Sequence, residues 1–263
     1  MASRNGLNPK IKGSKGVGFG RALPSVFGFG NGIQPNGSNN FLAIPNLLGK
    51  SLGSEFSIEF WFNYSGVFNF VDAIFELKTT SGDMYFGFQN NRIYGLTPTG
   101  EADISLAISA IKPNKNHIIL NFSDTGCDFS LNYSDPSGYR MIGFGNSFGL
   151  LTGEISLLNI FAITVNSWYG SQFYDELRIY EKNLTSEQII YNYNNGIGNN
   201  PSITEDLLVW YQFEKFENID FSAAQDGTNI LLGLKDYSGK NNHGQPINMD
   251  TNPSSNTFVL KTF

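Results

Sequence analysis

The sequence has little of several features, and each shortage excludes a class of protein. Its single cysteine, Cys127, cannot form an intramolecular disulfide, so the chain differs from disulfide-stapled secreted domains. It has no apolar run near the ~18 residues of a membrane helix, and its first 20 residues lack the apolar segment of a signal peptide. We therefore expect a protein that is made in the cytoplasm, without a signal peptide or a membrane span.

Sequence signatures of common cofactor sites are also missing. The two histidines, His117 and His243, have no second His or Cys at metal-ligand spacing, and the chain has neither a P-loop nor a complete GxGxxG motif. Residues 145–149 match the GxSxG pattern of serine hydrolases, but both flanks predict strands, whereas that motif needs a strand-to-helix turn. We therefore expect no nucleotide ligand and no serine-hydrolase site.

What the chain has in abundance favours many short strands. It contains 29 glycines and 23 phenylalanines, and 40% of its 263 residues are hydrophobic, which is enough for a substantial core. Between residues 55 and 165 many segments have apolar side chains at every second position, as in Phe56, Ile58, Phe60 and Phe62. The predicted class is all-β, with one large domain.

The stretch Tyr174–Gly196 begins with a predicted strand. Leu177 and Ile179 share one face of this strand and Arg178 points away from them, which is typical of a half-buried strand. Strict alternation places six side chains on two faces, with Tyr174, Glu176 and Arg178 on one and Asp175, Leu177 and Ile179 on the other.

The same stretch continues into a predicted helix. Thr185 is its expected N-cap, with Gln188 as the partner in a capping box. Leu184 and Ile189 occupy the two positions of a hydrophobic staple, and Gly196 supplies a left-handed stop.

This order of strand and helix resembles the end of the laminin-G-like modules of the concanavalin A-like lectin/glucanase superfamily. Residues 38–46 and 55–63 are similar to two earlier strands of that family. The resemblance implies a jelly-roll β-sandwich of two antiparallel sheets, with one short helix near 185–195, in a module from roughly residue 36 to 197. The residues that match the family's final motif are Asp175, Arg178, Tyr180, Leu184 and Ile189.

The segment after the helix resembles the opening of such a module. Leu207–Glu214 and Leu234–Gly244 look like strands and turns that normally precede the ones found here at 38–63. We expect residues 198–263 to complete the same sandwich, because chain termini usually lie close together and permutation is then physically easy. The alternatives are a truncated second module or a separate docking segment.

The N-terminal segment is basic and rich in glycine. All 23 acidic residues lie at or after Glu55, whereas six of the 17 Lys and Arg residues precede it. Residues 1–35 are therefore predicted to form an arm that lies on a negative surface or a neighbouring subunit. The alternative is a solvated leader. The expected contacts of the arm with an assembly are Arg4, Lys10, Lys12, Lys15, Phe27 and Phe29.

Two candidate sites remain. The family resemblance implies a structural calcium ion at Asp175, with further oxygens from Asn39 and Asn40, because several relatives use the equivalent Asp as a ligand. The alternative is that Asp175 only hydrogen-bonds the backbone at a sheet edge. Trp168 and Tyr169 lie in a predicted turn before the last strand and are the candidate contact for a carbohydrate or a protein partner.

The sequence also bears on catalysis. Glucanases that share this fold carry two catalytic Glu residues around an Asp on one strand, and no such trio is present. Glu55 and Glu59 are four residues apart on a strand, which separates their backbones by ~13 Å, too far for a retaining glycosidase. We expect no catalytic residues and no enzyme activity.

Together these patterns lead to three hypotheses of function. The first is a non-enzymatic structural protein of a virus particle, a bacteriophage capsid decoration or fibre-associated protein located in the virion, whose partners are other virion subunits. The second is a carbohydrate-binding lectin module, with glycans as ligands. The third, a glycoside hydrolase, lacks the carboxylate pair it would need.

Overall fold

The computed structural model describes residues 29–64, 72–89, 92–97, 100–105, 111–113, 115–123, 126–133, 139–141, 153–222, 231–255 and 259–263. Residues 1–28, with Arg4, Lys10, Lys12, Lys15 and Phe27, lie outside them, as does the GxSxG-like segment at 145–149.

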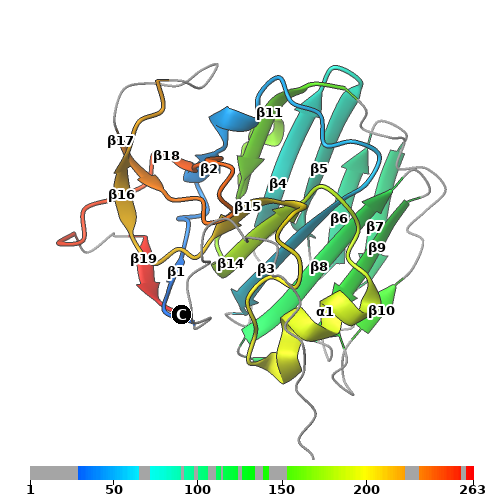
Figure 1. Cartoon of the computed structure of the whole chain (residues 1–263). Helices are drawn as coiled ribbons and strands as arrows, with labels where there is room; N and C mark the ends of the chain where they lie inside the picture. The colour runs from blue at the N-terminus through cyan, green and yellow to red at the C-terminus, as the bar shows by residue number, and fades with distance from the viewer. Residues whose placement is uncertain are drawn as a thin grey trace, which may run out of the picture.

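The described chain forms two large antiparallel sheets that face each other (Figure 1). The eight-stranded sheet has the order β10 (Tyr139–Met141), β9 (Gly126–Leu131), β8 (Lys115–Ser123), β3 (Phe56–Asn63), β14 (Phe173–Tyr180), β1 (Asn31–Ile33), β19 (Leu260–Thr262), and β15 (Leu207–Tyr211) also pairs with β14. The seven-stranded sheet has the order β18 (Gln245–Ile247), β2 (Phe41–Ala43), β11 (Ile155–Ile160), β4 (Asp72–Thr79), β5 (Gly82–Gln89), β6 (Arg92–Thr97), β7 (Gly100–Ser105). The predicted all-β sandwich of antiparallel sheets is confirmed.

Two small hairpins accompany the sheets. The first joins β12 (Ala162–Ile163) to β13 (Trp168–Tyr169) through the short 3-10 helix η3 (Thr164–Asn166). The second pairs β16 (Phe216–Ile219) with β17 (Leu231–Leu234) and stands beside the sandwich (Figure 1). A 3-10 turn, η1 (Pro45–Leu47), follows β2.

The main core lies between the two sheets and is rich in phenylalanine. Phe56, Ile58, Phe60 and Phe62 of β3 all point into it, as their alternation predicts. From the opposite sheet, Phe75 and Phe86 stack with ring centroids 5.8 Å apart, and both meet Phe122 edge to face. Because every second residue of β3 is in the core, Ser57, Glu59 and Trp61 project from the other face of the sheet.

The helix α1 (Ser186–Tyr193) covers that other face (Figure 1). The sequence pattern predicts that β14 is buried on one face only, whereas the structure buries it on both. The capping box is confirmed: the Gln188 N–H donates to Thr185 Oγ1 and the Thr185 N–H donates to Gln188 Oε1. Leu184 and Ile189 pack together against Tyr180. The short helix predicted near 185–195 is confirmed.

Two local predictions for this region need correction. Gly196 is left-handed as predicted, with φ 85°, but it ends η4 (Asn194–Gly196), and the left-handed residue that ends α1 is Asn194, with φ 43°. Asparagine tolerates this conformation because its side chain can bond locally. In β14 a bulge between Asp175 and Arg178 adds one residue relative to β3. Tyr174 therefore lies on the core face with Leu177, whereas the alternation predicts opposite faces.

The segment after α1 contributes strands to both large sheets. β15 pairs with β14, β19 pairs with β1, and β18 pairs with β2. The loop after β17 also closes the free edge of β15: Asp236 accepts hydrogen bonds from the Trp210 and Asn242 backbone N–H groups, and Asn242 Nδ2 donates to the Leu208 carbonyl. The position of β18 beside β2 is what completes the site described next.

Candidate functional site

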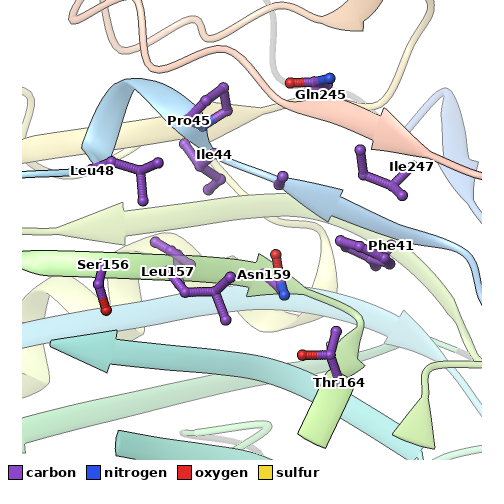
Figure 2. A pocket seen from close by; sticks show the side chains of 12 residues that line it. Phe41, Ile44, Pro45, Leu48, Ser156, Leu157, Asn159, Thr164, Gln245 and Ile247 are labelled. Carbon is purple, nitrogen blue, oxygen red and sulfur yellow. The ribbon is translucent and has the colours of Figure 1, made fainter. Parts of the chain in front are cut away.

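An open groove on the outer face of the seven-stranded sheet is the candidate binding site (Figure 2). Its volume is about 350 Å³, which falls within the range of small-molecule sites. Strands β2, β11 and β18 form it, so its walls come from three distant parts of the sequence. The apolar lining includes Phe41, Ala43, Leu48, Leu157 and Ile247, and the polar lining consists of Ser156, Asn159, Thr164 and Gln245.

Strand alternation explains why these side chains face outward. Leu42 is completely buried in the core between the sheets, so its neighbours Phe41 and Ala43 point to the opposite face. On β11, Leu158 and Ile160 belong to the core, and Asn159 between them projects into the groove wall. The alternation of side chains along β2 and β11 therefore determines which residues line the groove.

The polar corner of the groove is held from behind by Glu76 of β4. Glu76 Oε2 accepts hydrogen bonds from Asn159 Nδ2 at 3.3 Å, from the Thr164 N–H at 2.8 Å and from Thr164 Oγ1 at 2.6 Å. Glu76 Oε1 lies 3.3 Å from Lys78 Nζ. The Glu76 carboxylate is completely buried and does not line the groove itself.

The predicted contact pair Trp168 and Tyr169 lies in β13 on the same outer face, and both side chains are half-buried. Trp168 packs against Ala73 and Tyr85. Tyr169 stacks on Phe41, with ring centroids 6.4 Å apart and an interplanar angle of 29°. Tyr169 therefore supports an aromatic side chain that lines the groove, and a ligand contact at Trp168 or Tyr169 stays a prediction.

A second polar cluster is centred on Glu59, on the outer face of the eight-stranded sheet below α1. Glu59 Oε1 accepts from His117 Nε2 at 2.7 Å and from Arg178 Nη1 at 3.1 Å, and Glu59 Oε2 accepts from Tyr180 and Asn192 at 2.8 and 2.9 Å. Because a carboxylate only accepts, His117 Nε2 must carry the proton. Burial raises the pKa of Glu59, but Arg178 and the hydrogen-bonded His117 and Tyr180 outweigh it and lower the pKa to about 2.

Arg178 links this cluster to a second buried carboxylate. Its Nη2 atom donates to Glu176 Oε2 at 3.1 Å and to the Asn199 carbonyl at 2.6 Å. Glu176 Oε2 also accepts from Trp210 Nε1 at 2.7 Å. Burial raises the pKa of Glu176 to about 7, although Arg178 and Trp210 act in the opposite direction. All four lone-pair directions of Glu59 are used inside the protein, which is the pattern of a structural network.

Asp175 is almost completely buried, next to the cluster. Its Oδ1 atom accepts from the Glu176 N–H at 2.8 Å, and its Oδ2 atom has no hydrogen-bond partner among the described residues. Burial and the adjacent Glu176 raise the pKa of Asp175, which Lys115 counteracts.

The asparagine side chains expected at the predicted calcium site are engaged with other residues. The side chain of Asn40 is engaged by the Asn36 N–H and the Asn248 carbonyl, and Asn39 Oδ1 accepts from Asn36. Within the described residues, no group of three or more His, Cys, Asp or Glu side chains could hold a metal ion. A structural calcium ion at Asp175 stays a prediction.

Phe29, the first described residue, packs inside its own chain. Its ring meets Trp61 edge to face at 4.9 Å between centroids, and Lys115 Nζ lies 3.8 Å from the centre of the Phe29 ring. Residues 31–33, at the end of the predicted arm, form β1. The contacts of Arg4, Lys10, Lys12, Lys15 and Phe27 with an assembly stay predictions, because these residues lie outside the described chain.

The groove and the role of Glu76 were not predicted from the sequence. One weak signal was present, since Asn159 interrupts an otherwise apolar run in the segment Leu157–Ile163. A buried strand that carries one amide on its outward face predicts a polar contact there. The partner of that amide lies on β4, 83 residues earlier in the chain, and no local pattern names it.

Comparisons with known proteins show the fold. No protein-family model and no curated protein matches the sequence. Among solved structures, a protein from Bacteroides ovatus that is described as carbohydrate-binding has a TM-score of 0.55 at 14% identity and is matched over 90% of this chain. Full-length tailspike protein 2 from the Escherichia coli O157:H7 bacteriophage CAB120 has a TM-score of 0.50 at 13% identity over 69% of this chain.

A third match, a SAP-like pentraxin from Limulus polyphemus, has a TM-score of 0.46 at 12% identity and covers 64% of this chain and 83% of the pentraxin. The chain spans 60% of the length of the Bacteroides protein and 27% of the tailspike. In the part of the chain that the structure describes, no helix is both long and apolar enough to cross a membrane.

Proposed function

We propose that the chain is a non-enzymatic carbohydrate-binding protein and that the groove over β2, β11 and β18 is its binding site. One observation carries the proposal: an aromatic ring, Phe41, lines the groove together with the oriented polar side chains Asn159 and Thr164. Sugars present an apolar ring face and polar edges, and a site that combines an aromatic surface with a few fixed polar groups suits both.

The lining supports binding without hydrolysis. Glycosidases place two carboxylates on either side of the scissile bond, and none of the residues that line the groove is Asp or Glu. Glu59, considered above as half of a catalytic pair, is buried below α1 with both oxygens engaged, and Glu55 is exposed. The Bacteroides ovatus protein with a similar fold is described as carbohydrate-binding, which agrees with this proposal.

The test is a binding titration of the purified chain with a panel of neutral and acidic oligosaccharides by calorimetry. Phe41→Ala should weaken binding at least tenfold, since stacking on the ring is lost. Tyr191→Ala is the matched control, because Tyr191 is an aromatic residue half exposed on α1, on the opposite side of the sandwich. Equal affinity of the two variants, or no binding to any sugar by the unmodified chain, would contradict the proposal.

We also propose a virion role, as a bacteriophage capsid decoration or fibre-associated protein. The fold similarity to a phage tailspike favours it, and so does the anchoring of Phe29 by Trp61 and Lys115, which fixes where the basic segment 1–28 joins the sandwich. Deleting residues 2–20 should leave the thermal stability unchanged and abolish co-sedimentation with particles that lack this protein. Full occupancy by the truncated chain would contradict this role.

A further inference from the structure

The hydrogen bonds behind the groove determine which ligands the groove can accept. We propose that Glu76 is a positioning residue that makes the polar corner of the groove an acceptor surface, so that the site selects neutral ligands that donate hydrogen bonds from hydroxyl groups. This inference rests on the proposed binding function, and it adds to it a rule for ligand choice.

Three hydrogen-bond donors converge on one carboxylate oxygen of Glu76. Asn159 and Glu76 are directly paired on the neighbouring strands β11 and β4, and Thr164 opens η3 just beyond the end of β11. A single oxygen, Glu76 Oε2, receives the Asn159 amide, the Thr164 N–H and the Thr164 hydroxyl. Glu76 is completely buried, so solvent does not compete for these bonds.

The chemistry of a carboxylate then fixes the two groove side chains. A carboxylate has no proton to donate, so the Asn159 NH₂ group must face Glu76 and the Asn159 Oδ1 atom must face the other way. Figure 2 shows the Asn159 oxygen turned toward β2 and the nitrogen turned away from it. The single proton of the Thr164 hydroxyl is likewise directed to Glu76, which leaves only lone pairs on Thr164 Oγ1 for a ligand.

Both oxygens are available to a ligand. Within the described chain, neither Asn159 Oδ1 nor Thr164 Oγ1 accepts a hydrogen bond, and both residues line the groove. A ligand hydroxyl can donate to each of them. A ligand carboxylate, sulfate or phosphate has no proton to donate to these two oxygens, so its own oxygens would be repelled by them and by the nearby carboxylate of Glu76. It would also lose its hydration on entering the groove.

Glu76 also ties the β12–β13 hairpin to the sheet, so a loss of binding alone would not separate positioning from stability. A comparison of Glu76→Leu with Glu76→Gln separates them. Leucine removes the acceptor, so the Asn159 amide and the Thr164 hydroxyl can turn and present donors to the groove. In Glu76→Gln the amide oxygen takes the place of Glu76 Oε2, because the Thr164 N–H can only donate, and the polarity of the corner is kept.

The experiment titrates the unmodified chain, Glu76→Leu, Glu76→Gln and Thr164→Val with the best-binding neutral oligosaccharide of the panel and with its mono-O-methylated derivatives. Methylation removes a donor and keeps an acceptor. The unmodified chain and Glu76→Gln should bind at least one derivative about tenfold more weakly than the parent sugar, and Glu76→Leu should remove this difference. Thr164→Val should weaken binding of the parent sugar with a melting temperature close to that of the unmodified chain.

A measurement without ligand completes the test. In the free protein, exchange of the Asn159 side-chain amide protons with solvent, followed by NMR, should be slow in the unmodified chain and fast in Glu76→Leu. Fast exchange in the unmodified chain would overturn the inference, whatever the binding data show. Equal tolerance of methylation in the unmodified chain and Glu76→Leu would overturn the inference alone, whereas no binding to any sugar would overturn the proposed function and, with it, the rule for ligand choice.

Discussion

Arg178 and Glu59 form a completely buried ion pair between the neighbouring strands β14 and β3, with Nη1 and Oε1 3.1 Å apart. Both side chains are 0% exposed. Removing two charges from water is costly, and the pair is tolerated because His117, Tyr180 and Asn192 use the remaining lone pairs of Glu59. The helix α1 supplies Asn192 and shields the pair, so helix and sheet stabilise each other.

Glu59→Gln should therefore destabilise the fold by about 3 kcal/mol or more, because Arg178 is left with an incompletely compensated buried charge. Urea unfolding followed by tryptophan fluorescence measures the change. Glu55→Gln is the matched control, since Glu55 lies four residues earlier and is exposed, and its effect should stay within about 0.5 kcal/mol. Similar unfolding midpoints for the two variants would contradict a structural role for the Glu59 network.

The stability of the protein should have a maximum in mildly acidic solution. The pKa of Glu176 is raised from 4.5 to about 7, so the folded state binds more protons than the unfolded state, and stability falls as the pH rises from 4.5 through 7. The pKa of Glu59 is lowered from 4.5 to about 2, so its contribution is complete above 4.5 and is lost as the pH falls through 2.

Glu176→Gln measures the share of Glu176 in the fall of stability with rising pH, to which the buried Asp175, whose pKa is also raised, contributes in the same direction. Relative to the unmodified chain, the variant should gain stability between pH 5 and 7.5, by up to on the order of 3 kcal/mol, because the amide does not ionise. Thermal unfolding at a series of pH values measures it. If the stability of the two proteins changes with pH in the same way above pH 5, ionisation of Glu176 does not destabilise the folded state, which would contradict this prediction.

The sequence was sufficient to predict the elements whose causes are local. The period of two in Phe56–Phe62 and the capping residues Thr185 and Gln188 depend only on near neighbours, and the structure has both. The bulge in β14 was not predictable, because Glu176 with φ 53° carries none of the usual signals of a left-handed residue. That one residue moves Asp175 away from the face expected from alternation.

The candidate site was less predictable than the fold for a topological reason. The groove joins strands at residues 41–43, 155–160 and 245–247, and its geometry arises only when the last of these pairs with the first. Alternation shows that Asn159 leaves the core face of its strand, but the identity of its neighbours depends on long-range pairing. A single sequence contains no signal for that pairing.

The N-cap of α1 offers a test of how much the helix contributes. Thr185→Ala removes the oxygen that accepts the Gln188 N–H and should cost about 1 kcal/mol, with faster amide exchange in the first turn of the helix. Thr185→Ser keeps that oxygen and should cost clearly less. Both effects are read from urea unfolding and hydrogen exchange. Equal losses in the two variants would mean that packing of the Thr185 methyl group, and not the cap, stabilises this end.

The last prediction concerns Asp236, which joins the C-terminal segment to β15. Its carboxylate accepts from the buried backbone N–H groups of Trp210 and Asn242, and removing it leaves both donors unpaired. Asp236→Ala should therefore cost at least about 2 kcal/mol, since each unpaired buried donor costs about 1–3 kcal/mol. Urea unfolding measures this cost.

Asp236→Ala should also weaken sugar binding in the groove. β18 follows the loop that Asp236 organises, and it contributes Gln245 and Ile247 to the lining. Sugar affinity measured at a temperature where Asp236→Ala is still folded should fall, because a looser loop lets β18 leave β2. Asp220→Ala is the control, as Asp220 is exposed and, among the residues that the structure describes, its carboxylate accepts only from Ser222. If Asp236→Ala matches Asp220→Ala in both stability and binding, the loop does not hold the C-terminal segment in the sandwich.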